Sequence, residues 1–122
     1  METAVTEAPG IAQPYQGGIY AGLTIHNETP MRLVLLPDEF NGKWKPAMSW
    51  AKKLDAELPT RMDFLAMWNN ARGEFDKYWY WSGEEFESGA GYAWCQLFND
   101  GSQITSRKIL ELRARAVRRY AI

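Results

Sequence analysis

Few side chains in this sequence could carry out chemistry. It contains one cysteine, Cys95, and one histidine, His26. A catalytic nucleophile needs a nearby base, and a structural zinc site needs about four Cys or His ligands. One histidine leaves no second His for a catalytic pair, a Cys and a His alone cannot form a zinc site, and no intrachain disulfide is possible. We expect Cys95 to be a small buried apolar residue and His26 to lie in a solvated loop.

Oxygen-bearing side chains gather around two loops in the C-terminal third. Glu84, Glu85 and Glu87 belong to the first loop, and Asn99 and Asp100 belong to the second. Calcium takes six to eight oxygen ligands of these kinds, but the spacing of an EF-hand is missing. The sequence also lacks a nucleophile elbow, a phosphate-binding loop and a dinucleotide fingerprint. We therefore expect no catalytic residue, no metal and no cofactor.

The length and the net charge of the chain limit the kinds of domain and of binding partner that we expect. The 122 residues correspond to one domain, long enough to fold without a metal or a disulfide. The 14 basic and 15 acidic residues give a net charge of −1, so neither a nucleic acid nor an anionic membrane is an expected partner. No apolar run approaches the roughly 20 residues of a membrane span, and the first residues do not resemble a signal peptide.

The first half of the sequence predicts an arm, a hairpin and two helices. Residues 1–18 are small, polar and rich in Gly and Pro, as in a mobile arm that a neighbour could hold in place. Strands are predicted at 19–25 and 31–36, joined by a turn at 26–30, with Pro37 ending the second strand. The spacing of apolar residues predicts helices over 46–57 and from Thr60 to Gly73. Thr60 and Asp63 form a capping-box pattern, so Asp63 is expected to be a cap.

The second half predicts three more strands. Aromatic residues alternate with small or polar ones over 78–82 and 92–98, which is the period of a strand with one buried face. A glycine-rich loop at 83–91 and a tight reversal at 99–101 separate these segments. Arginines alternate with Ala and Val over 110–120, and six of the seven charged residues in 107–119 are basic. This pattern could bind phosphate, but we expect a strand with a solvated arginine face.

Aromatic residues are unusually abundant. The chain has six Trp, six Tyr and five Phe, and Trp50, Trp68, Trp79, Trp81 and Trp94 fit buried faces. Phe86 and Phe98 stand beside loops, where each could belong either to the core or to a contact surface. Aromatic side chains suit contact surfaces because they provide a large area at a small loss of conformational entropy.

Four segments carry a resemblance to a known family. They are Leu58-Pro-Thr-Arg61, Tyr78-Trp-Tyr-Trp-Ser82, Tyr92-Ala-Trp-Cys-Gln96 with Phe98-Asn-Asp-Gly101, and Arg113-Ala-Arg-Ala-Val-Arg-Arg119. Over residues 19–122 the chain resembles the domain found at the C-termini of collagen-like adhesins and in phage and prophage proteins. The resemblance implies an α+β, C-type-lectin-like fold with two helices on a twisted, mostly antiparallel sheet. A long excursion between the late strands would carry the ligand surface.

The same fold occurs in formylglycine-generating enzymes and in the variable proteins of diversity-generating retroelements. This chain lacks the two active-site cysteines of the former, and it lacks the disulfides and calcium motif of sugar-binding lectins. By analogy with the variable proteins, the resemblance places a partner surface in the late loops and strands. Its residues would be Glu85, Phe86, Glu87, Ser88, Gln96, Phe98, Asn99, Ser102, Gln103, Thr105 and Ser106.

The resemblance thus implies a non-catalytic binding or structural module of a phage or prophage. It would be a virion or tail component that recognises a protein or a glycan, with residues 1–18 attaching it to sister subunits or to a larger assembly. An alternative is a small effector in the host cytoplasm whose acidic loop 83–91 docks on a basic surface of a host enzyme or defence complex.

Overall fold

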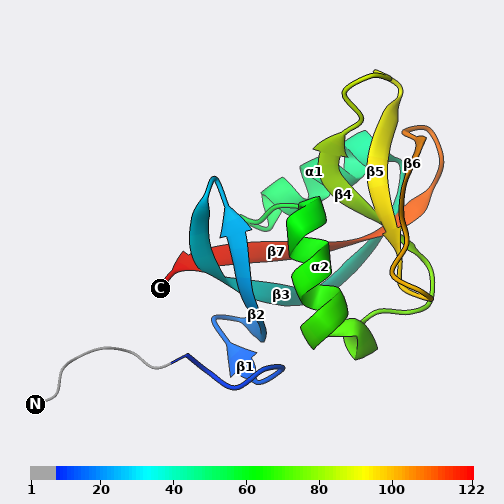
Figure 1. The fold of residues 1–122 in the computed structure, drawn as a ribbon. Coiled ribbons are helices and arrows are strands. Elements are labelled where there is room, and N and C mark those ends of the chain that lie inside the picture. The colour runs from blue at the N-terminus through cyan, green and yellow to red at the C-terminus, as the bar shows by residue number, and fades with distance from the viewer. Residues whose placement is uncertain (1–7) are drawn as a thin grey trace, which may run out of the picture.

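A single seven-stranded sheet with a helix on each face forms the body of the protein (Figure 1). The computed structural model describes residues 8–122. Neighbouring strands are antiparallel except β4 and β7, which are parallel, so the expected α+β architecture of two helices on a mostly antiparallel sheet is confirmed. Across the sheet the order is β1 (Pro14–Tyr15), β2 (Gly18–His26), β3 (Thr29–Gly42), β7 (Leu112–Ala121), β4 (Trp79–Glu85), β5 (Tyr92–Leu97) and β6 (Gln103–Arg107).

A tight turn joins β2 and β3. Asn27 and Glu28 both have positive φ angles, 50° and 65°, and connect the paired residues His26 and Thr29. Two consecutive positive φ angles are typical of the turns whose twist matches antiparallel strands. The expected turn at 26–30 is therefore shorter than predicted, and His26 is the partly exposed last residue of β2.

Part of the expected arm belongs to the sheet. The backbone amide of Ala12 donates to the carbonyl of Tyr20 at 2.8 Å, and Tyr15 packs edge-on against the rings of Tyr20 and Tyr120. Gly18 lies so close to Leu35 that an added Cβ would collide with the Leu35 carbonyl group. The boundary predicted at residue 18 is thus displaced toward the N-terminus, and the first seven residues of that arm lie outside the described residues.

The sequence predicted that Pro37 would end its strand, and this prediction is wrong. β3 continues to Gly42, with a shift of register against β7 between Leu35 and Glu39. A bulge of this kind accommodates proline because the ladder is interrupted there. Arg115 completes the bulge: its Nε and Nη2 atoms donate to the carbonyl oxygen of Leu36 at 3.2 and 2.8 Å.

The helices are shorter than the sequence predicted. Helix α1 (Trp44–Lys53) starts two residues early because Trp44 is buried and its indole N–H donates to the carbonyl of Ser82 at 2.8 Å. Helix α2 (Arg61–Asn70) starts with the predicted capping box, which is confirmed in both hydrogen bonds, and is followed by the 3₁₀ turn η1 (Arg72–Glu74). No helix within residues 8–122 has the length and apolar character needed to cross a membrane.

Each helix covers its own hydrophobic core. Alternate residues of the central strands point to opposite faces, as Trp81 and Tyr80 of β4 show. Trp81 packs under α1 with Cys95, whose predicted burial is confirmed. Tyr80 packs under α2 with Phe64 and other aromatic residues. In Figure 1, α2 lies in front of the sheet and α1 behind it.

The arginines of β7 do not form the expected solvated face. β7 is an inner strand, between β3 and β4, and its arginines bind groups of the body. Arg115 is 7% exposed, and Arg118 donates to the backbone carbonyls of Leu54 and Asp55. Arg113 forms ion pairs with Glu39 and Asp76, and Arg119 forms them with Glu57 and Asp63. The sequence predicted the strand correctly, but its charged side chains hold the fold together.

Candidate functional site at the tip of the β4–β5 hairpin

The residues expected to bind a partner lie on β4, β5, β6 and their loops, but they separate into two groups. Ala93 pairs with Glu85 on one side and with Ser106 on the other, and Trp94 pairs with Thr105. This register places Glu85–Ser88 and Thr105 toward the same end of β5, whereas the hydroxyl of Ser106 lies 3.4 Å from Sγ of Cys95 on the opposite face, which α1 covers. Asn99 and Ser102 lie at the opposite end of β5, a strand of six residues and about 20 Å. The expected long excursion is a compact hairpin that widens the sheet.

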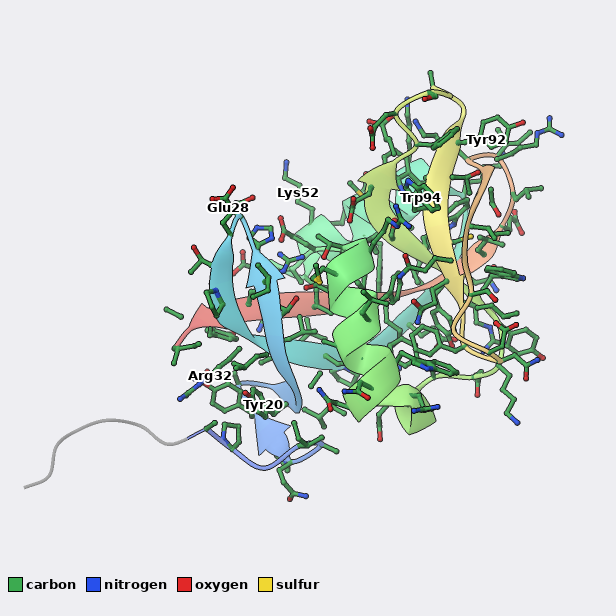
Figure 2. All side chains as sticks on the ribbon, viewed as in Figure 1. Tyr20, Glu28, Arg32, Lys52, Tyr92 and Trp94 are labelled. Carbon is green, nitrogen blue, oxygen red and sulfur yellow. The ribbon has the colours of Figure 1, made fainter. Side chains whose placement is uncertain are left out.

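The two ends differ in how they are covered. The loop between β4 and β5 projects beyond both helices in Figure 1, whereas the turn between β5 and β6 lies near the lower end of α2. We call residues 85–92 together with Trp94 and Thr105 the tip surface, and residues 96–103 the closed end. In Figure 2, Tyr92 and Trp94 are labelled on the tip surface.

Phe98 and Gln96 are wrong as contact residues, because the structure buries both. Phe98 is 4% exposed and its ring stacks on Phe75 with 3.9 Å between centroids. It also meets Phe64 and Tyr80 edge-on, so its alternative assignment to the core is confirmed. Gln96 is fully buried beneath α2. Helix α2 covers this end of β5 and leaves no space for a partner.

Gln103 links β6 to the start of α2. Its Nε2 donates to the carbonyl of Arg61 at 3.1 Å and to the side-chain oxygen of Gln96 at 2.9 Å. Its Oε1 accepts from Nε of Arg61 at 2.9 Å. Because its polar atoms are satisfied inside the protein, Gln103 acts as a connector within the fold.

Asn99 and Ser102 are exposed but lie outside the tip surface. The backbone amide of Ser102 donates to the carboxylate of Asp100 at 2.9 Å and closes the turn. The pKa of Asp100 is lowered mainly by the hydrogen bond of the Ser102 side chain and further by this backbone hydrogen bond. This turn is therefore ordered by its own hydrogen bonds.

An aromatic group with an arginine forms the centre of the tip surface. The guanidinium carbon of Arg61 lies 3.5 Å from the ring centre of Trp94, and Phe86 meets that ring edge-on at 5.8 Å. Tyr92 is 41% exposed beside them. The sequence placed Trp94 in the core and overlooked Arg61 and Tyr92. The available signal was the alternation in β5, where Ala93 and Cys95 occupy the buried α1 face and Trp94 the other.

The acids of the loop are largely engaged. A side-chain oxygen of Glu84 accepts from the backbone amide of Arg61 at 2.7 Å. Glu85 forms an ion pair with Lys108, and that hydrogen bond lowers the pKa of Glu85. Glu87 and Ser88 are exposed at the end of the loop.

The acids do not assemble into a metal site. Glu84 to Glu87 lie at the tip, whereas Asn99 and Asp100 belong to the closed end. No cluster of three or more His, Cys, Asp or Glu within residues 8–122 could hold a metal ion.

The tip surface therefore offers binding rather than reactive groups. Aromatic rings and an arginine suit contact with apolar protein surfaces, with carboxylates or with the C–H faces of sugars. Cys95 lies on the other face of β5, and burial raises the pKa of its thiol, which keeps it protonated and shielded at neutral pH. Compared with protein-family models and with curated protein sequences, the chain matches none of them.

Proposed function

We propose that the protein is a non-catalytic binding module of a phage or prophage, associated with the virion or tail, which recognises a protein or a glycan through the tip surface. The observation that carries this proposal is the aromatic group of Phe86, Tyr92 and Trp94, which lies beside Arg61 at the N-terminal end of α2. The motif resemblance to phage proteins of C-type-lectin-like fold supports the biological setting, and the two-helix α+β architecture is compatible with that fold.

A prearranged tip favours recognition. Lys108 joins both sides of the hairpin, since its ammonium group donates to Glu85 and to the carbonyl of Ala90. Arg61 is held by Gln103, so its stacking on Trp94 is also fixed before a partner arrives. Binding then orders few side chains, and less of the interaction energy is lost to conformational entropy.

The alternative is an effector that docks its acidic loop on a host protein. Glu84 accepts a hydrogen bond from the backbone of Arg61, whereas Glu85 keeps a side chain that is 58% exposed although it pairs with Lys108, and Glu87 is exposed as well. Lys108 offsets the charge of Glu85, which lessens the electrostatic basis of this alternative.

Two matched tyrosines test the tip surface. Tyr92 lies on it, and Tyr78 is 55% exposed just before β4, at the opposite end. Partners would be captured from host surface extract and from cytosol on immobilised protein, and their glycans on a glycan array. We expect Tyr92→Ala to weaken capture of the same partner at least tenfold and Tyr78→Ala to leave it unchanged. Equal behaviour of both variants would remove the tip surface from the proposal.

The setting is tested separately. Presence of the protein in purified particles supports the virion role, whereas a single stoichiometric cytosolic partner supports the effector. Deletion of residues 1–7 should lower incorporation into particles if these residues attach the module. Unchanged incorporation and oligomeric state would contradict the attachment.

A further inference from the structure

A hollow of about 500 Å³ lies between α1, the segment 54–60, the end of β2 and β7. Its volume is typical of small-molecule sites. The charged side chains around it are Lys52, Glu57 and Arg119, with His26 at the end of β2 and an apolar wall from Met48 and Leu58. Lys52, Glu57 and Arg119 also line a second, adjoining hollow of about 400 Å³. These three side chains therefore lie at the boundary between the two hollows. None of these residues belongs to the tip surface.

Arg119 is fixed in place by a buried carboxylate. Its Nε and Nη2 atoms donate to Oδ2 of Asp63 at 3.1 and 2.6 Å. Asp63 is fully buried and also accepts from the hydroxyl of Thr24 at 2.5 Å and the backbone amide of Thr60 at 3.0 Å. Since the carboxylate is satisfied on both oxygens, the buried pair is well compensated and the guanidinium is held rigidly.

The outer nitrogen of Arg119 binds a carboxylate that is easily displaced. Nη1 pairs with Glu57, whose side chain is 66% exposed, whereas the Arg119 side chain is only 6% exposed. Because the Glu57 carboxylate is largely solvated and its flexible side chain must be held in one position, this half of the ion pair is weakly bound. Glu57 thus occupies a position at which another carboxylate could bind the same nitrogen.

Lys52 adds a second cation to the site. It lies in the last turn of α1. It lines both hollows, and in Figure 2 its side chain extends outward from α1. When Glu57 turns away, Lys52 and the outer nitrogen of Arg119 leave the hollow with an excess of positive charge.

We propose that this hollow binds a small organic carboxylate. The carboxylate replaces Glu57 at Nη1 of Arg119 and is attracted by Lys52, while the apolar body of the molecule lies against Met48 and Leu58. The observation that favours a carboxylate over other anions is that the protein's own occupant of this nitrogen is a carboxylate.

Benzoate and its neutral analogue benzamide test the site. The full chain, labelled with ¹⁵N, would be titrated with each compound at constant ionic strength, and amide shifts would be followed by NMR. We expect benzoate to shift amides of residues 48–60 and 119 with a Kd of about a millimolar, and benzamide to cause no comparable shifts. Equal effects of the two compounds would overturn the proposal.

Two variants with opposite expected effects make the test specific. Glu57→Gln removes the competing carboxylate and should strengthen benzoate binding several-fold, whereas Lys52→Met should weaken it several-fold. The matched controls, Glu28→Gln and Lys53→Met, change the same charges at exposed positions outside the lining of the hollow and should leave the Kd unchanged. Unchanged or weaker binding by Glu57→Gln contradicts displacement.

A titration with inorganic phosphate completes the experiment. A phosphate Kd as low as that of benzoate would show a general anion site and contradict the assignment to an organic carboxylate. Thermal melting of each variant verifies folding. Loss of the tip-surface partner leaves this result unaffected, since the two sites share no residue.

Discussion

Phe86 and Phe98 lie at the two ends of the same three-stranded unit, and both stand beside loops in the sequence, so each was assigned either to the core or to a contact surface. Phe98 lies at the closed end, under α2, with Phe64, Phe75 and Tyr80 around its ring. Phe86 lies at the tip, is partly exposed and has one ring contact, with Trp94. The difference comes from the position of α2, which covers one end of β5 and stops before the other. Stability and recognition are thereby assigned to opposite ends.

The largest effect is expected at the closed end. Phe98→Ala removes a ring from a tightly packed cluster and should lower the free energy of unfolding by about 3–5 kcal/mol. Urea unfolding followed by tryptophan fluorescence measures the change. A loss under about 1.5 kcal/mol would show that this end repacks easily and is less rigid than the comparison requires.

A pair of glycines sharpens the same contrast. Gly101 has a φ of +81°, and an added Cβ would lie 2.9 Å from the ring of Trp68, whereas nothing lies within 4 Å of a Cβ at Gly91 near the tip. Gly101→Ala should cost about 1–2 kcal/mol because of the left-handed backbone and the close ring. Gly91→Ala should change stability by less than about 0.5 kcal/mol. Equal melting temperatures for the two variants would contradict the contrast.

At the tip, Phe86→Ala should affect binding more than stability. The ring makes one edge-on contact with Trp94, which is worth about 1 kcal/mol. We expect a small change in the urea midpoint together with weaker capture of the partner found with the wild-type protein. A loss as large as that of Phe98→Ala would place Phe86 in the core.

The smallest effect concerns the ion pair at the tip. The hydrogen bond from Lys108 lowers the pKa of Glu85 in the folded protein, so the pair stabilises the fold above the ordinary pKa of glutamate. This contribution is lost as the pH falls through the lowered folded-state pKa. The urea midpoint of the wild type should exceed that of Glu85→Gln at pH 7, and the two should converge in acid. Glu87→Gln is the control, and an equal difference for it would exclude a specific role of Lys108.

Local patterns in the sequence predicted most of the elements. The alternation over 78–82 and 92–98 predicted β4 and β5, and the pair Thr60 and Asp63 predicted the start of α2. Pro37 misled the prediction because proline ends a regular strand but not one with a bulge, and the bulge depends on Arg115 from a strand nearly 80 residues away. No strand was predicted over β6, Gln103–Arg107, because this edge strand has a weak alternation of exposed and buried residues.

The candidate site was predicted less well. The resemblance placed it in the late loops, and Glu85 to Ser88 and Thr105 do lie toward one end of β5, whereas Ser106 contacts Cys95 on the opposite face. Gln96 and Phe98 lie on the same strands, but burial removes them from any surface. Arg61, which stacks on Trp94, comes from α2 and has no signal in the neighbouring sequence.

By itself, the sequence determined where strands, turns and helix caps form, because these depend on side-chain period and on local hydrogen bonds. Only the tertiary structure decided which parts of the protein pack against each face of a strand. Alternation in β7 indicated one buried face but could not show that Arg115 and Arg119 would bind a distant carbonyl and a buried aspartate. Nor could it show which end of β5 would lie under α2, since coverage depends on how whole elements pack and not on the residues that are covered.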